Sequence, residues 1–251
     1  VLNKWPEVIN NGTIMVLEKY FESGVDAIPK SPDPISALMY KLFSGPDYSL
    51  ISYTVGHFMN FVKGMNAIKS LLYSENNPPE LSLIIENIDS LLKSPILQHI
   101  VDHDPAKKLK RKTVLILGHF LKYQFKSQCL EMIEWYSKLD AFYSMALACE
   151  KNNFSFPVFA DAERPQLSAT QLYHPLLPTP VSYDIELDPK ENFLFLTGAN
   201  MAGKSTFIKA VGVSVYLAHL GMAVPAKKME LSLFDGLLSN IQVVDNLTKG
   251  E

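Results

Sequence analysis

At residues 198–206 the chain reads Gly-Ala-Asn-Met-Ala-Gly-Lys-Ser-Thr. This stretch fits the pattern G-x-x-x-x-G-K-[ST], which describes a loop whose backbone N–H groups surround phosphate oxygens. An apolar run at residues 193–197 precedes the loop and predicts a buried strand, and residues 205–220 after it predict a helix that is apolar on most sides. A strand, this loop and a helix in that order predict a nucleotide-binding P-loop.

The residue types of the loop indicate what each could do. Gly198 and Gly203 allow a tight turn, and the N-terminus of the following helix adds a partial positive charge at the same place. We expect Lys204 to act in catalysis by reaching the β- and γ-phosphates, and the Ser205 hydroxyl to ligate Mg²⁺. The alternative is a glycine-containing turn from strand to helix with an exposed lysine and no ligand.

Composition sets wider limits. A chain of 251 residues with 47% hydrophobic content is long enough for one large or two modest domains. The net charge of −3 leaves no globally basic surface for nucleic acid, so DNA binding would need a local patch or a partner. Two cysteines, Cys129 and Cys149, are too few for a disulfide scaffold and fit a reducing, cytoplasmic compartment. No apolar run reaches the length of a membrane span.

The pattern of apolar residues changes along the chain. Helical spacing predicts helices at 35–43, 49–73, 81–92, 105–123 and 128–151, whereas short strands with Pro-rich turns are predicted at 181–187 and 193–196. The predicted fold class is therefore α plus α/β, with an all-helical domain over residues 1–160 followed by an α/β domain over residues 161–251.

The loop also resembles a particular family. Residues 197–206 closely resemble T-G-P-N-M-G-G-K-S-T, the P-loop of the MutS family of DNA mismatch repair ATPases, with Ala199 in place of proline and Ala202 in place of glycine. The pair Asn200-Met201 is unusual among other P-loop families. The resemblance covers roughly residues 130–251 and includes the segments 139–141, 152–157, 173–175, 216–226 and 245–247.

This resemblance implies a helical core and lever domain at 1–160 and the N-terminal half of an ABC-type P-loop ATPase domain at 161–251. It implies ATP and Mg²⁺ as ligands, DNA as a partner, and a homodimer in which ATP binding moves the helical levers of a DNA clamp. It places Pro180 and Val181 beside the base, with His174 nearby. Nucleotide contacts are implied for Gly198, Ala199, Asn200, Met201, Ala202, Gly203, Lys204, Ser205 and Thr206.

Two features limit the expected activity. Residue 251 falls where the signature loop of that family would begin, and no apolar strand ending in an acidic residue follows residue 206. We therefore expect the chain alone to hydrolyse ATP poorly or not at all. The chain also lacks the Phe-x-Glu element with which the family detects mismatches, so recognition of branched or recombining DNA is an open alternative.

A dense basic cluster predicts a possible contact with the DNA backbone, although such a run can equally be a solvated helix face. It consists of Lys107, Lys108, Lys110, Arg111 and Lys112. Two other functions stay open at this point. One is an ABC-type ATPase that does not act on DNA, and the other is a non-enzymatic module regulated by a nucleotide.

Overall fold

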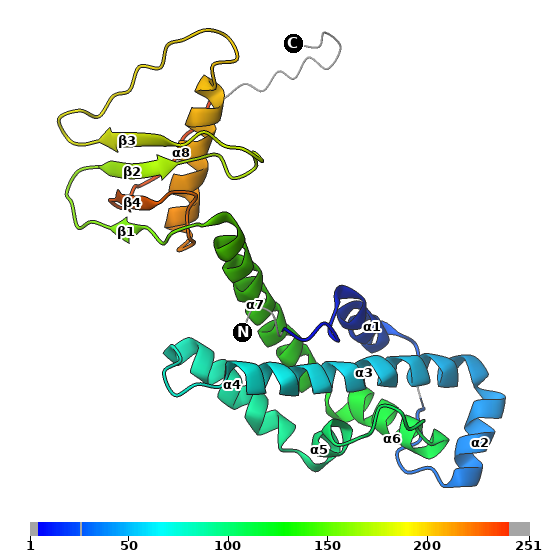
Figure 1. Cartoon of the computed structure of the whole chain (residues 1–251). Helices are drawn as coiled ribbons and strands as arrows, with labels where there is room; N and C mark the ends of the chain where they lie inside the picture. Colours follow the sequence, from blue (N-terminus) through cyan, green and yellow to red (C-terminus); the bar gives the residue numbers. More distant parts are fainter. Residues whose placement is uncertain (1–4, 26, 241–251) are drawn as a thin grey trace. The chain divides into compact units, whose positions relative to one another are not determined.

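The computed structural model of the chain describes residues 5–25 and 27–240. It divides into two compact units, Val1–Ala141 and Phe142–Glu251, and the division falls inside helix α7 (Lys126–Asn152) (Figure 1). The sequence pattern changes from helical to strand-like near residue 160. The domain limits 1–160 and 161–251 that follow from this pattern stay predictions. Within the described ranges, no helix is both long and apolar enough to cross a bilayer.

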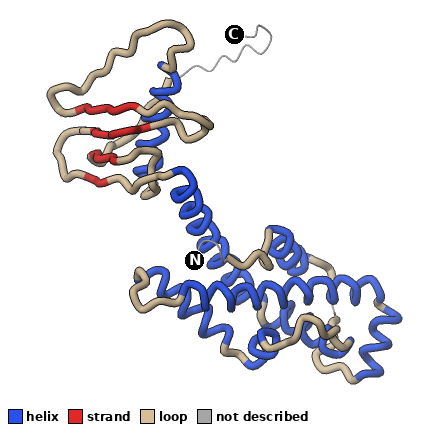
Figure 2. The backbone as a smooth tube through the Cα atoms, in the orientation of Figure 1, coloured by secondary structure: helices blue, strands red, loops and turns tan. Residues whose placement is uncertain are grey.

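The first unit is built of helices around α3, as the sequence predicts. Helices α1, α4, α5 and α6 all contact this long helix, and α2 contacts both α3 and α6. Figures 1 and 2 show α3 running through the unit. The helices are α1 (Asn11–Glu22), α2 (Pro34–Phe43), α3 (Gly45–Leu72), α4 (Pro79–Leu92), α5 (Pro95–Val101), α6 (Arg111–His119), a π-helical turn η2 (Phe120–Gln124) and the first part of α7.

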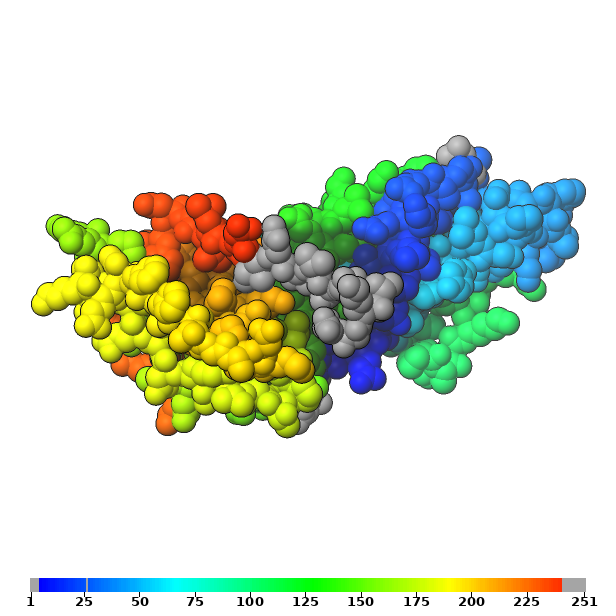
Figure 3. All heavy atoms as spheres, turned by 90° about the horizontal axis from the view of Figure 1, so that it is seen from above, coloured from blue at the N-terminus to red at the C-terminus, as the bar shows by residue number. Residues whose placement is uncertain are grey.

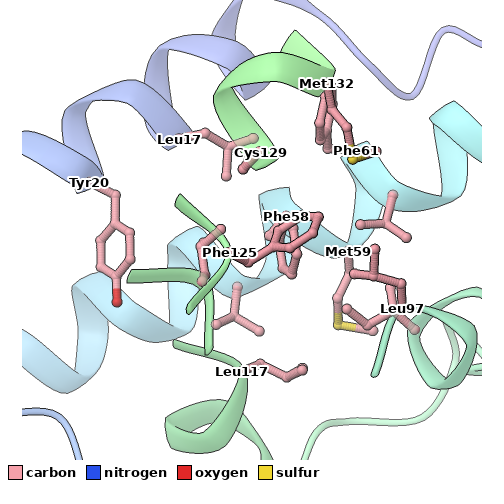
Figure 4. Close-up of a cluster of buried hydrophobic side chains, with 14 of the residues drawn as sticks. Leu17, Tyr20, Phe58, Met59, Phe61, Leu97, Leu117, Phe125, Cys129 and Met132 are labelled. Carbon is pink, nitrogen blue, oxygen red and sulfur yellow. The ribbon is translucent and has the colours of Figure 1, made fainter. Parts of the chain in front are cut away.

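The centrality of α3 follows from its sequence, because apolar residues occupy more than one of its faces. Phe58, Phe61 and Met65 are fully buried in one hydrophobic cluster. Figure 4 shows Phe58 and Phe61 in this cluster with Leu17 of α1 and Met132 of α7. A helix that is apolar on several sides is stable only when other elements cover it. The predicted helices at 35–43, 49–73, 81–92 and 128–151 are confirmed within a few residues.

The predicted helix at 105–123 is wrong in its first third. Helix α6 begins only at Arg111, and a π-helical turn replaces its end. Asp104 explains the late start, since its side chain accepts from the N–H of Ala106 at 3.0 Å and its carbonyl from the N–H of Lys107 at 3.0 Å. An aspartate that binds nearby backbone groups in this way favours a turn over a helix.

The second unit is a four-stranded sheet with one helix against it (Figure 1). The strand order is β1-β4-β2-β3, in which β2 is antiparallel to both of its neighbours and β1 is parallel to β4. Helix α8 (Lys204–His219) buries Ala210 and Ala218 in the same cluster as Leu172 and Met229 of the sheet region. The strands are β1 (Val158–Phe159), β2 (Leu167–Leu172), β3 (Tyr183–Leu187) and β4 (Lys228–Leu231).

The end of α7 is fastened within this second unit. Asn153 is left-handed, with φ 55°, and the N–H of Phe154 donates to the carbonyl of Cys149 at 3.0 Å, which is the Schellman arrangement of a helix end. The Tyr173 hydroxyl donates to the carbonyl of Asn152. Ser155 then exchanges two backbone hydrogen bonds with residue 224 of the turn that follows α8. The end of α7 is thus bonded to the turn that leaves the predicted P-loop helix.

The predicted buried strand at 193–197 is wrong. Residues 193–199 are irregular, and the side chains of Phe193 and Phe195 are 81% and 78% exposed. A strand requires hydrogen-bonding neighbours, and no segment within residues 5–25 and 27–240 pairs with this one. The other predicted strand, at 181–187, is confirmed as β3, and the predicted helix at 205–220 is confirmed as α8.

Candidate functional site

The loop at 198–203 ends in a backbone geometry that suits an anion. Gly203 is the residue before the first turn of α8 and has φ 85° and ψ 10°, a left-handed conformation that favours glycine. No side chain in the described part of the chain caps this helix. The N–H groups of its first turn therefore have no side-chain acceptor and can serve an anion. Residues of this region, coloured yellow to orange, reach the surface of the unit (Figure 3).

Lys204 lies across its own loop. Its Nζ donates to the carbonyl oxygens of Gly198 and Ala199, each at 2.7 Å, and the N–H of Ala202 donates to the carbonyl of Ala199 at 3.2 Å. These bonds hold a full positive charge beside the uncapped helix end. An ammonium has three donors, so one remains for another acceptor. The structure thus brings Gly198, Ala199, Gly203 and Lys204 together, as the motif predicts.

Two other loop residues face solvent. Met201 is left-handed, with φ 64°, and its side chain is fully exposed. A left-handed residue with a side chain costs about 1–2 kcal/mol, so the loop is held in this shape by its neighbours. Ser205 is exposed in the first turn of α8. Its part in Mg²⁺ binding stays a prediction.

A pocket of about 420 Å³ lies between the loop and strand β3. The loop side is lined by Thr197, Ala202, Gly203 and Lys204, and the strand side includes Tyr183. Sequence reasoning singled out the segment 180–183 but assigned the base contact to Pro180 and Val181, and it gave Tyr183 no role of its own. The signal that could have found it is the alternation of β3, in which residues 183, 185 and 187 share the face that packs toward α8.

The residues predicted to lie beside the base are not among those lining this pocket. His174 accepts at Nδ1 from the N–H of Leu176 at 3.3 Å, and Pro180 and Val181 lie in the exposed segment before β3. Their contact with a nucleotide stays a prediction, as do the contacts assigned to Asn200 and Thr206. The segment 245–247 falls outside the described residues.

Helix α8 has a second apolar face that the small sheet does not cover. A groove of about 800 Å³ runs along it, lined by Leu194 and Leu196 from the irregular segment and by Ile208 and Tyr216 from the helix. The side chains of Ile208 and Tyr216 are 46% and 58% exposed. The apolar segment at 193–197 therefore borders an open groove instead of forming a strand.

The basic cluster belongs to the first unit. Its five side chains are exposed around the start of α6, where Lys110 is the residue before the helix and Arg111 its first residue. Lys107 of the cluster forms a long ion pair, with 4.0 Å between its Nζ and a carboxylate oxygen of Asp104. Positive charge at a helix N-terminus opposes the helix dipole, which leaves the cluster attractive to an anionic partner. A DNA contact here stays a prediction.

Comparison with known proteins shows that the chain is similar to MutS proteins. The family model described as MutS domain V matches residues 194–251. The DNA mismatch repair protein MutS of Staphylococcus haemolyticus is 34% identical over 167 residues, which cover 57% of this chain and 19% of that protein. The same-named protein of Oceanobacillus iheyensis is 33% identical over 121 residues, covering 46% of this chain and 14% of that protein. The aligned part thus spans less than a fifth of these relatives.

Proposed function

Because this chain belongs to the MutS family, we propose that it is the ATP-binding part of a protein that acts on DNA in mismatch repair or a related DNA transaction. The observation that supports this most directly is the left-handed Gly203 at the uncapped start of α8, with the Lys204 ammonium held beside it. An anion-binding helix end and a nearby cation are what a phosphate chain requires.

The loop residues have distinct parts in this proposal. The N–H groups of the first turn of α8 bind the phosphate oxygens, and Lys204 exchanges one or both of its carbonyl acceptors for the β- and γ-phosphates. Because bonds between two charged groups are stronger than bonds from an ammonium to a neutral carbonyl, this exchange favours the nucleotide. Ser205 holds Mg²⁺, which would offset phosphate charge when bound. Asn200 and Thr206 also contact the nucleotide.

The helical part of the chain transmits nucleotide state in this proposal. Hydrogen bonds link the end of α7 and the residues just after it to the turn that follows α8. A shift of the P-loop helix can therefore be passed to α7 through these hydrogen bonds. The cluster at 107–112 contacts the phosphate backbone of DNA and contributes affinity without reading sequence. Two copies form a homodimer whose closure depends on ATP, and the protein works in the cytoplasm.

The first test is equilibrium binding of ATP with Mg²⁺ to the chain. We expect Lys204→Ala to weaken binding by tenfold or more, at roughly 1.5–3 kcal/mol for a charged hydrogen bond. Lys209→Ala is the matched control, because Lys209 lies on the same helix, beyond the loop, and should change affinity by less than about twofold. Equal affinity in the two variants would refute the proposed site.

The second test is binding of duplex DNA as a function of salt. Replacing Lys108, Lys110 and Lys112 by alanine should reduce the slope of log K against log salt by about 0.9 for each lost phosphate contact. Lys19→Ala is the control, since that lysine is paired with Glu22 at 2.9 Å on α1. ATP binding with an unchanged salt slope would favour an ABC-type ATPase that does not act on DNA.

A further inference from the structure

The first residue of β3, Tyr183, lies against the last glycine of the loop. A Cβ atom built on Gly203 would lie 3.3 Å from the Tyr183 hydroxyl oxygen, and among the described residues no other atom outside its chain neighbours comes within 4 Å of that position. The phenol therefore occupies the space on this side of a left-handed residue. The φ of 85° favours glycine at position 203, and a side chain there would also press closely on the phenol oxygen.

The Tyr183 ring is held in place at both of its ends. Its backbone pairs with Leu172 of β2, and the neighbouring Asp184 accepts from the N–H of Gln171 at 2.7 Å. The ring meets Phe207 of α8 edge to face, with centroids 5.3 Å apart and planes at 87°. Such aromatic pairs contribute about 0.5–1.5 kcal/mol beyond the area they bury. The sheet thus fixes the tyrosine independently of the loop.

Phe207 connects this contact to the turn that binds the anion. Its N–H donates to the carbonyl of Gly203 at 2.9 Å, which is the first hydrogen bond of α8. Tyr183 therefore contacts the helix start through the ring of Phe207, and its hydroxyl fills the position beside Gly203 that a side chain there would approach. Beyond the phenol, the turn faces the pocket of about 420 Å³, and no second side chain of residues 5–25 and 27–240 lies within 4 Å of the position of a Cβ on Gly203, its chain neighbours aside.

We propose that Tyr183 is a positioning residue of the nucleotide site, which holds the Gly203 turn so that the first N–H groups of α8 stay aimed at the phosphate chain of a nucleoside triphosphate. This inference rests on the proposed function and deepens it. A preformed cradle binds more tightly because the loop loses less conformational freedom when the phosphates arrive. Loss of the phenol leaves the phosphate ligands present but the turn free to move.

The first experiment measures the Kd of ATP with Mg²⁺ for the full chain. Tyr183→Leu keeps an apolar side chain on the strand but cannot reach Gly203, and it should raise the Kd by about tenfold. Tyr183→Phe removes the hydroxyl that faces Gly203 but keeps the ring against Phe207, so its Kd should fall between those of the wild type and Tyr183→Leu. Tyr216→Ala is the matched control and should bind as the wild type does, because it lies on α8 away from the loop. Equal affinity of Tyr183→Leu and the wild type would overturn the inference.

A double-mutant cycle separates a direct contact from a general loss of stability. Gly203→Ala should weaken ATP binding in the wild-type background through its backbone strain and its new contact with the phenol. In the Tyr183→Leu background the contact is gone, so the same substitution should cost a smaller factor. If the two factors simply multiply, Tyr183 does not act through Gly203.

Amide hydrogen exchange of residues 198–206, without nucleotide, tests the inference even if ATP does not bind. Tyr183→Leu should speed exchange in this stretch by about tenfold while the exchange of β2 and β4 is unchanged. Absence of ATP binding in the wild type would reject the proposed function. Unchanged exchange in the variant would reject the positioning role.

Discussion

Gly56 and Gly64 lie on the same helix, α3, two turns apart, and differ in what surrounds them. A Cβ on Gly56 would meet nothing within 4 Å, whereas a Cβ on Gly64 would lie 2.4 Å and 2.5 Å from Cγ1 and Cδ1 of Ile9. The Ile9 side chain is 4% exposed and cannot move aside into solvent. The same substitution to alanine should therefore have opposite effects at the two positions.

The magnitudes follow from two opposing contributions. Replacing a glycine inside a helix by alanine stabilises it by about 0.5–1 kcal/mol, so Gly56→Ala should stabilise the first unit by that amount. Gly64→Ala has the same gain but adds overpacking, which costs about 1–3 kcal/mol, so the net effect should be a loss of about 0–2.5 kcal/mol. The difference between the two variants isolates the overpacking, because helix propensity cancels.

Urea unfolding followed by tryptophan fluorescence measures this difference in the right part of the molecule. The chain has two tryptophans, Trp5 and Trp135, and both lie in the first unit, packed against its core. The urea midpoint should be higher in Gly56→Ala than in the wild type, and lower in Gly64→Ala than in Gly56→Ala. The slope of the unfolding free energy against urea concentration should be the same in both variants.

A second substitution shows whether Ile9 is the cause. Ile9→Ala removes the two nearest atoms that the new Cβ would strike and leaves Cγ1 of Val8 at 3.0 Å, so Gly64→Ala should be less costly in that background. If Gly64→Ala were as stabilising as Gly56→Ala in the wild type, Ile9 would not pack on α3 as described. The close approach of residues 8–9 to the helix would then be wrong.

Three other properties can be checked on the same chain. Burial raises the pKa of the Cys129 thiol to about 12, so a thiol reagent at about pH 8 should modify Cys149 quickly and Cys129 only on unfolding; equal rates would contradict the buried site. Backbone hydrogen bonds from the first turn of α2 lower the pKa of Asp33, so its stabilising effect is present above its unfolded pKa of about 3.9 and is lost as pH falls through the lower folded value. Asp33→Asn keeps an oxygen that can cap the helix but lacks the charge, so the urea midpoints of the wild type and this variant should converge in acid; a constant gap would show that the charge of Asp33 does not stabilise α2. Tyr173→Phe removes the donor to the carbonyl of Asn152 and should make amide exchange in the last turn of α7 about fivefold faster; unchanged exchange would show that the bond does not hold the helix end.

Much of the first unit is predictable because helices depend on local spacing. The apolar positions of α3 and α4 recur at the helical period, and the structure has both helices within a few residues of the predicted ranges. The turn at Asp104 was missed because it depends on one side chain competing for backbone hydrogen bonds, which a hydrophobic pattern does not register.

The candidate site was predictable only in part. The glycine and lysine positions of the loop follow from the motif, and the structure places the left-handed turn and the ammonium where the motif requires them. Tyr183 could not be assigned in this way. Strand β3 and an irregular segment separate it from Gly203 in the sequence, and only the fold brings the two residues together.

By itself the sequence determined most of the longer helices, the family resemblance and the turn before α8, because helical periodicity and the left-handed freedom of glycine act over a few residues. Only the tertiary structure decided which apolar segments become strands. The parallel pairing of β1 with β4 joins residues 158 and 230, and the equally apolar segment at 193–197 has no partner among the described residues. The physical reason is that a strand forms its hydrogen bonds with another segment of chain, whereas a helix forms them with itself.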